Sequence, residues 1–241
     1  MNNFIYLTLF SSVFDSYFQT SIPQKAYQKG CFNYRLYNIR HWANRGQVDD
    51  YLYGGGKGML LRIDCLVKTL AAVYEEYGPD CYVILLSPQG QRFTQKEIPD
   101  LVKKKNLVFI CGYYEGFDAR ALNYADKLIS VGDFINTNGE LPALIITDAL
   151  IRALPGVLDP IAYQNETFSE GDNFDFDAYT RPAIFENQAV PQILLSGHHE
   201  EIRKWRKQNS LQKAQTRIPN QEKKIIPNAN RWRLIQKKNK N

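Results

Sequence analysis

The sequence predicts an α/β protein with a mostly parallel sheet. Three short, mainly apolar runs look like strands that are buried on both faces: Tyr82–Leu86, Leu107–Cys111 and Lys127–Val131. Segments with the apolar periodicity of a helix lie between such runs along the first 155 residues. Strands that alternate with helices are typical of a parallel sheet whose faces are covered by helices.

The other elements of this region fit the same pattern. Phe4–Phe10 is predicted as the first strand, because it is apolar and has no basic flank. Ile63–Tyr77 places apolar residues on one helical face, and Gly78 follows it as a stop signal. Leu141–Leu154 is predicted as a nearly all-apolar helix with Pro142 in its first turn. We therefore expect a central sheet with flanking helices.

Three regions are expected along the chain. Residues 1–158 form the α/β domain, residues 159–179 form a flexible linker, and residues 180–241 form a small basic, helical domain. The linker is rich in Asp, Asn, Glu, Ser and Phe and has no periodicity. The last region contains a predicted basic helix capped by Ser196, and its final ~20 residues are dominated by Asn and Lys, which predicts disorder.

Composition indicates a cytoplasmic protein. Hydrophobic residues make up 44% of the chain and charged residues 23%, which is ordinary for a soluble domain. No apolar run approaches the ~20 residues of a transmembrane helix, so we expect neither a membrane span nor a signal peptide. The four cysteines and three histidines form no zinc-binding spacing. Reduced thiols and no metal site are the expectation.

Charge is distributed unevenly along the chain. Residues 201–241 carry 13 Lys or Arg and two Glu, a net charge of +11. Residues 1–200 carry 17 basic and 23 acidic residues, a net charge of −6. A mildly acidic body with a strongly basic end indicates a polyanionic partner. A solvated tail without a partner stays open for the end of the chain.

Three glycine-bearing loops follow three of the predicted strands: Ser87–Gly90, Gly112–Gly116 and Gly132–Glu140. Ligands of parallel sheets bind beyond the carboxyl ends of the strands, where these loops should meet. None of them has the GxGxxG or Walker A spacing, and Tyr53–Gly58 lacks the GK[ST] ending of a phosphate loop. The chain has no GxSxG nucleophile either. The remaining chemistry is that of a carboxylate and an arginine with a bound cofactor.

The loops belong to an ordered set of motifs that spans about residues 4–217. The set comprises Val48–Asp50, Tyr53–Gly56, Leu86–Gly90, Ile110–Gly112, Tyr114–Gly116, Gly132-Asp133, Gly139–Ala143, Asp148, Arg152, Pro155–Leu158, Tyr179–Pro182, and Leu195–His198 through Trp205-Arg206. In these motifs and their order the chain resembles the bacterial tRNA (guanine-N1-)-methyltransferase family, a group of knotted, SPOUT-type enzymes that modify the guanine 3′ to the anticodon.

The resemblance implies a deep trefoil knot in the α/β domain, an obligate homodimer, and S-adenosyl-L-methionine as the methyl donor. It leaves magnesium open and assigns no residue to a metal. The residues that it places around the donor are Pro88, Gln89, Gly90, Gly112, Glu115, Val131, Gly132, Asp133, Phe134, Ile135, Asn136, Gly139, Leu141 and Pro142.

The resemblance also implies two catalytic residues. Arg152 fills the family's arginine position, where it can stabilise negative charge on the guanine oxygen. The base position lies in the linker, where the family has Asp-Ser-Phe and this chain has Glu166 followed by Thr-Phe. Glu166 keeps the carboxylate but adds one methylene, and a misplacement of about 1 Å can cost on the order of a hundredfold in rate. Asp172 or Asp175 as the base, or an impaired site, are the alternatives.

The expected function is methylation of guanine N1 at position 37 of tRNA. Four side chains are expected to contact the RNA: Asp50, Arg181, Arg203 and Arg206. Two other functions stay open, namely methylation of another RNA by the same knotted fold, and RNA binding by a homodimer whose catalysis is impaired. The set of tRNA isoacceptors and the donor affinity do not follow from the sequence.

Overall fold

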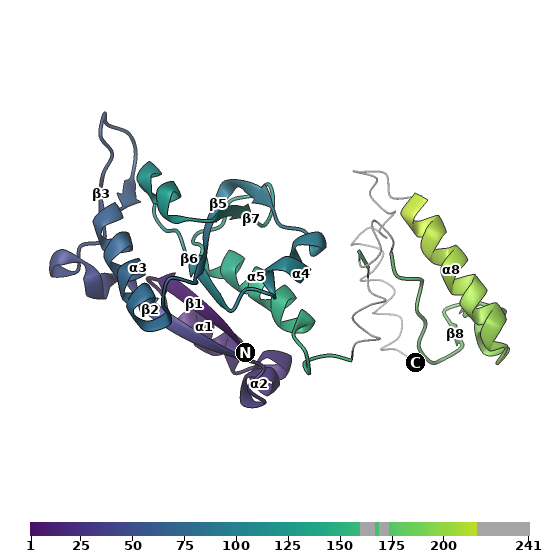
Figure 1. Cartoon of the computed structure of the whole chain (residues 1–241). Coiled ribbons are helices and arrows are strands. Elements are labelled where there is room, and N and C mark those ends of the chain that lie inside the picture. Colours follow the sequence, from purple (N-terminus) through teal and green to yellow (C-terminus); the bar gives the residue numbers. More distant parts are fainter. Residues whose placement is uncertain (160–166, 169–173, 216–241) are drawn as a thin grey trace, which may run out of the picture. The chain divides into compact units, whose positions relative to one another are not determined.

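The computed structural model describes residues 1–159, 167–168 and 174–215. The chain divides into two compact units, Met1–Asn165 and Glu166–Asn241, which are described separately here. Figure 1 shows the first unit in purple to green and the second in green to yellow.

The first unit is built on one five-stranded sheet in which every pair of neighbouring strands is parallel. The strand order is β2-β1-β6-β5-β7. The strands are β1 (Asn2–Thr8), β2 (Phe32–Asn38), β5 (Tyr82–Arg92), β6 (Asn106–Ile110) and β7 (Lys127–Ser130). The predicted α/β class is confirmed.

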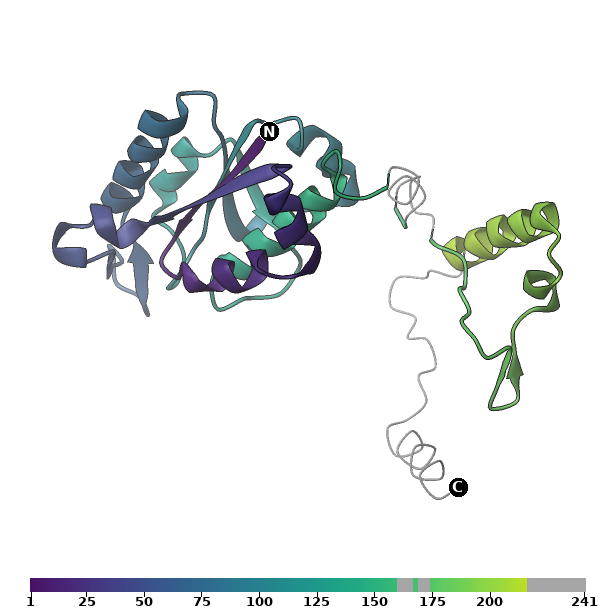
Figure 2. The same ribbon diagram turned by 90° about the horizontal axis from the view of Figure 1, so that it is seen from below.

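Helices cover both faces of this sheet (Figures 1 and 2). Alternate residues of β1 point to opposite faces, because side chains along a strand alternate. Phe4 and Tyr6 belong to one core cluster, together with buried residues of four helices, whereas Ile5 and Leu7 belong to the other, together with one helix. The first group is α1 (Ser12–Phe18), α2 (Ser21–Gln28), α4 (Ile98–Leu101) and α5 (Glu140–Ala153), and the single helix is α3 (Ile63–Tyr77).

Short elements connect these layers. In the described part of the first unit, 3₁₀ turns are found at η1 (Ile39–Trp42), η2 (Asn44–Gly46), η3 (Gln95–Glu97) and η4 (Ala119–Tyr124). The antiparallel hairpin of β3 (Asp49–Tyr51) and β4 (Met59–Leu61) stands beside the main sheet. Its turn is the glycine-rich run Tyr53–Gly58, in which Tyr53 is fully exposed. The rejected phosphate loop is therefore a hairpin turn.

The sequence located most elements of the first unit. Helix α3 has the predicted bounds, and Gly78 ends it with a φ of 77°. Helix α5 begins at Glu140, one residue before the prediction. The strand β2 was not expected, because its sequence mixes polar and apolar residues and gives no apolar run. The helices α1 and α2 were also missed.

The longest strand, β5, leaves the sheet and returns to it. Leu86 and Gln91 both pair with Ile129 of β7, so the four residues between them project as a loop. Gly90 closes this loop against the strand, because a Cβ on it would lie 2.5 Å from the carbonyl carbon of Ile129. The predicted strand ended at Leu86, where the first part of β5 stops pairing.

The described part of the second unit consists of a hairpin and two helices: β8 (Ile184–Phe185), β9 (Gln188–Ala189), α7 (Gln192–Leu195) and α8 (His199–Gln215). Glu186 and Asn187 turn the hairpin with φ angles of 49° and 62°, the backbone of a primed two-residue turn. Helix α8 is the predicted basic helix. Ser196 lies ahead of it and accepts a hydrogen bond from the amide of His198 at 3.1 Å, so it does not cap α8 directly as predicted.

Candidate functional site

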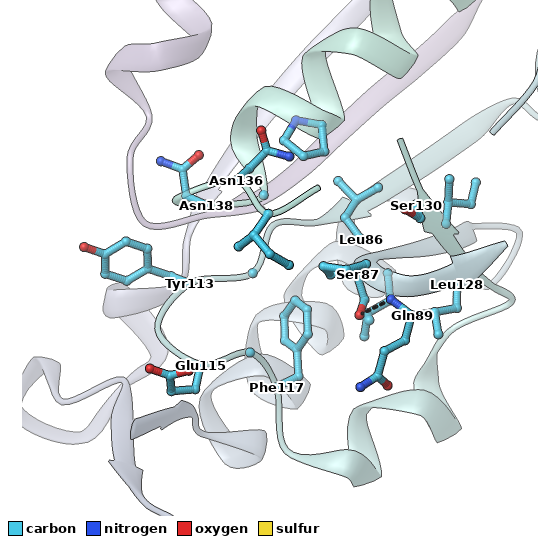
Figure 3. Close-up of a pocket in the computed structure, with 18 of the residues that line it drawn as sticks. Leu86, Ser87, Gln89, Tyr113, Glu115, Phe117, Leu128, Ser130, Asn136 and Asn138 are labelled. Carbon is cyan, nitrogen blue, oxygen red and sulfur yellow. Dashed lines mark hydrogen bonds between the residues drawn. The ribbon is translucent and has the colours of Figure 1, made fainter. Parts of the chain in front are cut away.

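A cavity of about 650 Å³ lies beyond the carboxyl ends of β5, β6 and β7. Its wall is formed by the three glycine-bearing loops that the sequence singles out. Figure 3 labels residues that line it: Ser87 and Gln89 of the first loop, Tyr113 and Glu115 of the second, and Asn136 and Asn138 of the third. The volume is within the range of pockets that bind small molecules and cofactors.

Most of the residues predicted to contact the donor line this cavity. They are Pro88, Gln89, Gly112, Glu115, Val131, Gly132, Phe134, Ile135, Asn136, Gly139 and Pro142. These residues come from segments as much as 54 positions apart in sequence, counted from Pro88 to Pro142. The fold therefore brings together the set that the motifs indicated.

Three predicted contacts lie outside the cavity wall. Gly90 packs on the backbone of Ile129, behind the first loop. Asp133 is exposed and forms an ion pair with Arg92. Leu141 is half exposed on the first turn of α5.

Other wall residues were not predicted. Phe117 points into the cavity from the loop before η4, and Leu128 and Ser130 contribute from β7 (Figure 3). Tyr114 adopts a φ of 60°, and burial raises the pKa of its hydroxyl. The sequence signal that could have identified these wall residues is their position next to the glycines, at the ends of predicted strands.

Backbone contacts hold the second and third loops together. The amide of Gly139 donates to the carbonyl oxygen of Gly112 at 2.8 Å. A Cβ on Gly139 would lie 2.4 Å from the amide nitrogen of Gly112 and 2.7 Å from the Cα of Cys111. No side chain fits between these segments, so glycine is required for the close approach.

A buried carboxyl group lies directly behind the third loop. Glu140 is 1% exposed, and its Oε1 accepts a hydrogen bond from the Thr8 hydroxyl at 2.5 Å. Burial raises the pKa of Glu140, and the hydrogen bond from Thr8 partly offsets this effect. The neighbouring thiol of Cys111 also has a raised pKa, because it is buried and lies near Glu140.

The raised pKa of Glu140 predicts a pH-dependent stability. The folded state holds the proton more tightly than the unfolded chain, so this stabilisation is complete below the ordinary pKa of 4.5 and is lost as pH rises through the raised pKa. Glu140→Gln removes the ionisable group, so this loss of stability at higher pH does not occur in the variant. We expect its melting temperature to exceed the wild-type value at pH 7.5 by about 2–4 °C, equivalent to ~1 kcal/mol, and the gain to vanish near pH 4.

Differential scanning calorimetry across this pH range measures the effect. Glu75→Gln, which changes an exposed carboxylate of α3, serves as the matched control and should track the wild type. A Glu140→Gln curve that runs parallel to the wild-type curve at every pH would contradict the prediction.

Arg152 does not line the cavity. It lies in the last turn of α5, whereas Gly139 and Pro142, which do line it, lie at the helix start. Twelve residues separate Glu140 from Arg152, which at 1.5 Å per residue is about 18 Å along the axis. The same face of α5 carries Asp148, which accepts a hydrogen bond from the Tyr17 hydroxyl at 2.6 Å.

The predicted RNA contacts lie on β3 of the first unit, and on α8 and the segment before β8 of the second unit. Asp50 is on β3 and lies 3.5 Å from the guanidinium of Arg62. The exposed Arg181 precedes a cis peptide bond to Pro182. On α8, Arg203 pairs with Glu200 at 3.6 Å, and Arg206 lies over the ring of Phe176 at 4.6 Å.

The segment before Arg181 is attached to α8 through Asp177. The amide of Asp177 donates to Asn209 Oδ1 at 2.7 Å, and its carboxylate accepts from Asn209 Nδ2 at 3.1 Å. Lys213 pairs with the same carboxylate at 2.9 Å. Ser210 adds a hydrogen bond to the carbonyl of Phe174. One face of α8 therefore holds the end of the predicted linker.

Asp177→Ala is expected to release this segment. It removes a charged pair and a hydrogen bond, worth about 1–3 kcal/mol locally, so the open population should rise roughly tenfold. Limited proteolysis reports the opening as faster cleavage near residues 174–180. Asp175→Ala is the matched control, because the Asp175 side chain is exposed and its amide bond to Thr167 Oγ1 is kept. Equal cleavage rates for the two variants would contradict the assignment.

Two candidates for the base, Glu166 and Asp172, lie outside the described residues. The third, Asp175, is described and exposed. Within the described ranges, no group of three or more His, Cys, Asp or Glu side chains could hold a metal ion. None of the described helices is both long and apolar enough to cross a membrane.

Comparison with known proteins decides the family. The profile of the family described as tRNA (Guanine-1)-methyltransferase TrmD matches residues 2–224, which include both units. This chain belongs to that family. The predicted membership and class of enzyme are confirmed, and methyl transfer to tRNA is the family's reaction.

Individual members of the family match over most of their length. A tRNA (guanine-N(1)-)-methyltransferase of Syntrophomonas wolfei is 45% identical over 208 residues, which cover 85% of this chain and 84% of the relative. One from Clostridium botulinum (strain Alaska E43) is 41% identical and covers 97% and 98%. The crystal structure of the tRNA (m1G37) methyltransferase from Aquifex aeolicus superposes with a TM-score of 0.72 at 36% identity and covers 91% and 90% of the two chains.

Proposed function

We propose that this methyltransferase transfers a methyl group from S-adenosyl-L-methionine to N1 of the guanine at position 37 of tRNA, 3′ to the anticodon. The observation that carries the proposal is the cavity at the carboxyl ends of β5, β6 and β7, whose wall consists of the family's own motifs. The relatives are named for methylation of the same base atom, and the Aquifex aeolicus enzyme is named for the same tRNA position.

The cavity fits a donor of this size and polarity. Gly112 and Gly132 let the rings of Phe117 and Phe134 pack directly on the backbone of the wall, because a Cβ there would lie 2.9 and 2.5 Å from those rings. Asn138 presents a buried Oδ1 without a hydrogen-bond partner among the described residues. Such an acceptor suits a ligand that brings a donor. When bound, S-adenosylmethionine supplies an electrophilic methyl group.

The catalytic work on guanine falls to two side chains in this proposal. Arg152 stabilises the negative charge that develops on guanine O6, as cationic groups do at developing oxyanions. Glu166 takes the proton from N1, because its carboxylate occupies the base position of the family motif. The alternative bases are Asp175, which lies within the described residues, and Asp172, which lies outside them.

Arg152→Ala is expected to lower kcat by about 10²–10³-fold, the usual cost of losing one charge-stabilising group. Donor affinity should stay within twofold, because Arg152 lies outside the cavity wall. Single-turnover methylation and calorimetric titration with S-adenosylmethionine separate the two effects. Lys68→Ala, which removes an exposed lysine of α3, is the control for loss of charge alone. If Arg152→Ala lowered donor affinity and the methylation rate together, that result would contradict a role of Arg152 in stabilising charge on guanine O6.

The position of Arg152 supports a homodimer. It lies ten residues beyond Pro142 of the cavity wall, about 15 Å along α5, which is too far for direct action in the cavity of its own chain. A second copy could bring its Arg152 to the cavity of the first. The close backbone contact of the second and third loops, at Gly112 and Gly139, supports the trefoil knot. Knots are rare because connections seldom thread loops.

The basic helix α8 and the hairpin that carries Asp50 are proposed to hold the tRNA in the cytoplasm, where this substrate is found. Salt-dependent contacts to phosphates are expected from Arg203 and Arg206. Arg181 precedes them along the same unit.

Purified protein, S-adenosylmethionine and an unmodified tRNA transcript test the proposal, with and without magnesium chloride. The expected product after nucleoside digestion is 1-methylguanosine. A different methylated nucleoside would favour another RNA reaction of the knotted fold. Donor binding without any product would favour the RNA-binding homodimer with impaired catalysis, for which the Glu166 replacement is the motivating observation.

A further inference from the structure

Glu140 is a buried ionisable group that the proposed reaction does not use. It is the first residue of α5 and follows Gly139, whose amide donates to the carbonyl oxygen of Gly112 at 2.8 Å. Glu140 itself does not line the donor cavity, whereas Gly139 directly before it and Pro142 two residues after it do. It is therefore placed to act on the wall from behind.

Two hydrogen bonds and one ring contact link Glu140 to the second glycine-bearing loop. Its Oε1 accepts from the Thr8 hydroxyl at 2.5 Å, and the oxygen of that hydroxyl accepts from the amide of Phe10 at 2.9 Å. The Phe10 ring contacts the Tyr113 ring edge-on, with centroids 4.9 Å apart. Tyr113 lines the cavity. One carboxylate thus connects the start of α5, the loop after β1 and the second glycine-bearing loop.

This arrangement is costly for folding alone. Removing a carboxylate from water carries a penalty unless hydrogen bonds replace its hydration. The Thr8 hydroxyl and the backbone amides of Leu9 and Phe10 offset part of this penalty, yet Oε2 accepts no hydrogen bond of standard geometry from the described residues and burial still raises the pKa of Glu140. Proteins tend to keep such locally unfavourable groups at functional positions. The geometry therefore calls for a role other than stability.

We propose that Glu140 is a positioning residue for methyl-donor binding, which sets the spacing between the Gly112 and Gly139 loops through Thr8 and Phe10. The proposal rests on the proposed function, because it takes the cavity as the donor site. Its charge matters, since hydrogen bonds to a carboxylate are roughly twice as strong as those to a neutral acceptor.

Calorimetric titration of the full chain with S-adenosylmethionine, combined with thermal unfolding, tests the role. Glu140→Gln keeps the size of the side chain and should weaken donor affinity three- to tenfold without lowering the melting temperature at pH 7.5. Thr8→Val removes the linking hydroxyl and should weaken affinity by a similar factor. Combined, the two changes should cost little more than either alone, because they break the same connection. The KM for the donor should rise more than kcat falls.

Thr147→Val is the matched control. Thr147 is fully buried on the same helix and binds the Tyr6 hydroxyl at 2.7 Å, away from the cavity. It should lower the melting temperature but leave donor affinity within twofold. The inference would be overturned if the Glu140→Gln and Thr8→Val variants both bound the donor with wild-type affinity. A wild-type chain that bound no donor would overturn the proposed function as well, so the two failures are distinguishable.

Discussion

Gly139→Ala is expected to leave no measurable methyl-donor binding. The added Cβ would lie 2.4 Å from the amide nitrogen of Gly112 and 2.7 Å from the Cα of Cys111. Both are backbone atoms of a buried strand end and cannot rotate away, so the second and third loops must separate. The φ of Gly139 is −85°, which any residue adopts, and space is therefore the sole obstacle. Overpacking of this kind costs about 1–3 kcal/mol or more.

Substitutions at two other glycines are expected to affect donor binding less than Gly139→Ala does. A Cβ on Gly132 would meet only the ring of Phe134, which can turn, so Gly132→Ala should weaken binding without abolishing it. Gly30 has a φ of 70° and open space, so Gly30→Ala should cost about 1–2 kcal/mol of stability and leave donor affinity unchanged. Calorimetric titration with S-adenosylmethionine and thermal unfolding measure both quantities. Donor affinity retained in Gly139→Ala would contradict the close packing of the loops.

Glu166→Ala is expected to lower the single-turnover rate by about 10²–10⁴-fold, the usual contribution of a general base. Binding of S-adenosylmethionine should not change, because the base acts on guanine. Glu166→Asp restores the residue of the family motif and should be at least as fast as the wild type, since it removes the extra methylene. Rapid-quench methylation with enzyme in excess over tRNA isolates the chemical step.

Variants at the alternative bases serve as controls. Asp175→Ala and Asp172→Ala should each keep at least a third of the wild-type rate if Glu166 is the base. A large loss in one of them, with Glu166→Ala near the wild type, would move the base to that aspartate. A pH–rate profile supports the assignment, because removing the working base should abolish the acidic limb.

The sequence predicted the first unit well where apolar runs are uninterrupted. The three strands β5, β6 and β7 give such runs, and their following glycines placed the site at the correct edge of the sheet. The edge strand β2 was missed because Phe32–Asn38 contains no apolar run, although Phe32–Leu36 alternates apolar and polar residues as a half-buried strand does. The excursion of β5 between Leu86 and Gln91 was also missed, since periodicity does not show that both residues pair with Ile129.

The other features that were not predicted depend on contacts between segments far apart in the sequence. Thr8 and Glu140 are 132 positions apart, and neither residue type alone indicates a buried hydrogen bond. The close approach of Gly139 to Gly112 depends on which loops cross, and that information is not contained in glycine spacing. For the catalytic side chains the resemblance named Arg152 and Glu166, whereas the structure adds the separation of Arg152 from its own cavity.

One pair of tRNA substrates decides whether this enzyme methylates guanine N1 at position 37. Two tRNA transcripts that differ only in guanine or adenine at position 37 are incubated with the wild-type chain and radiolabelled S-adenosylmethionine, and the labelled nucleoside is mapped. We predict 1-methylguanosine at position 37 of the first transcript and no incorporation above background in the second. Equal incorporation into both transcripts, or none into either, would contradict the claim.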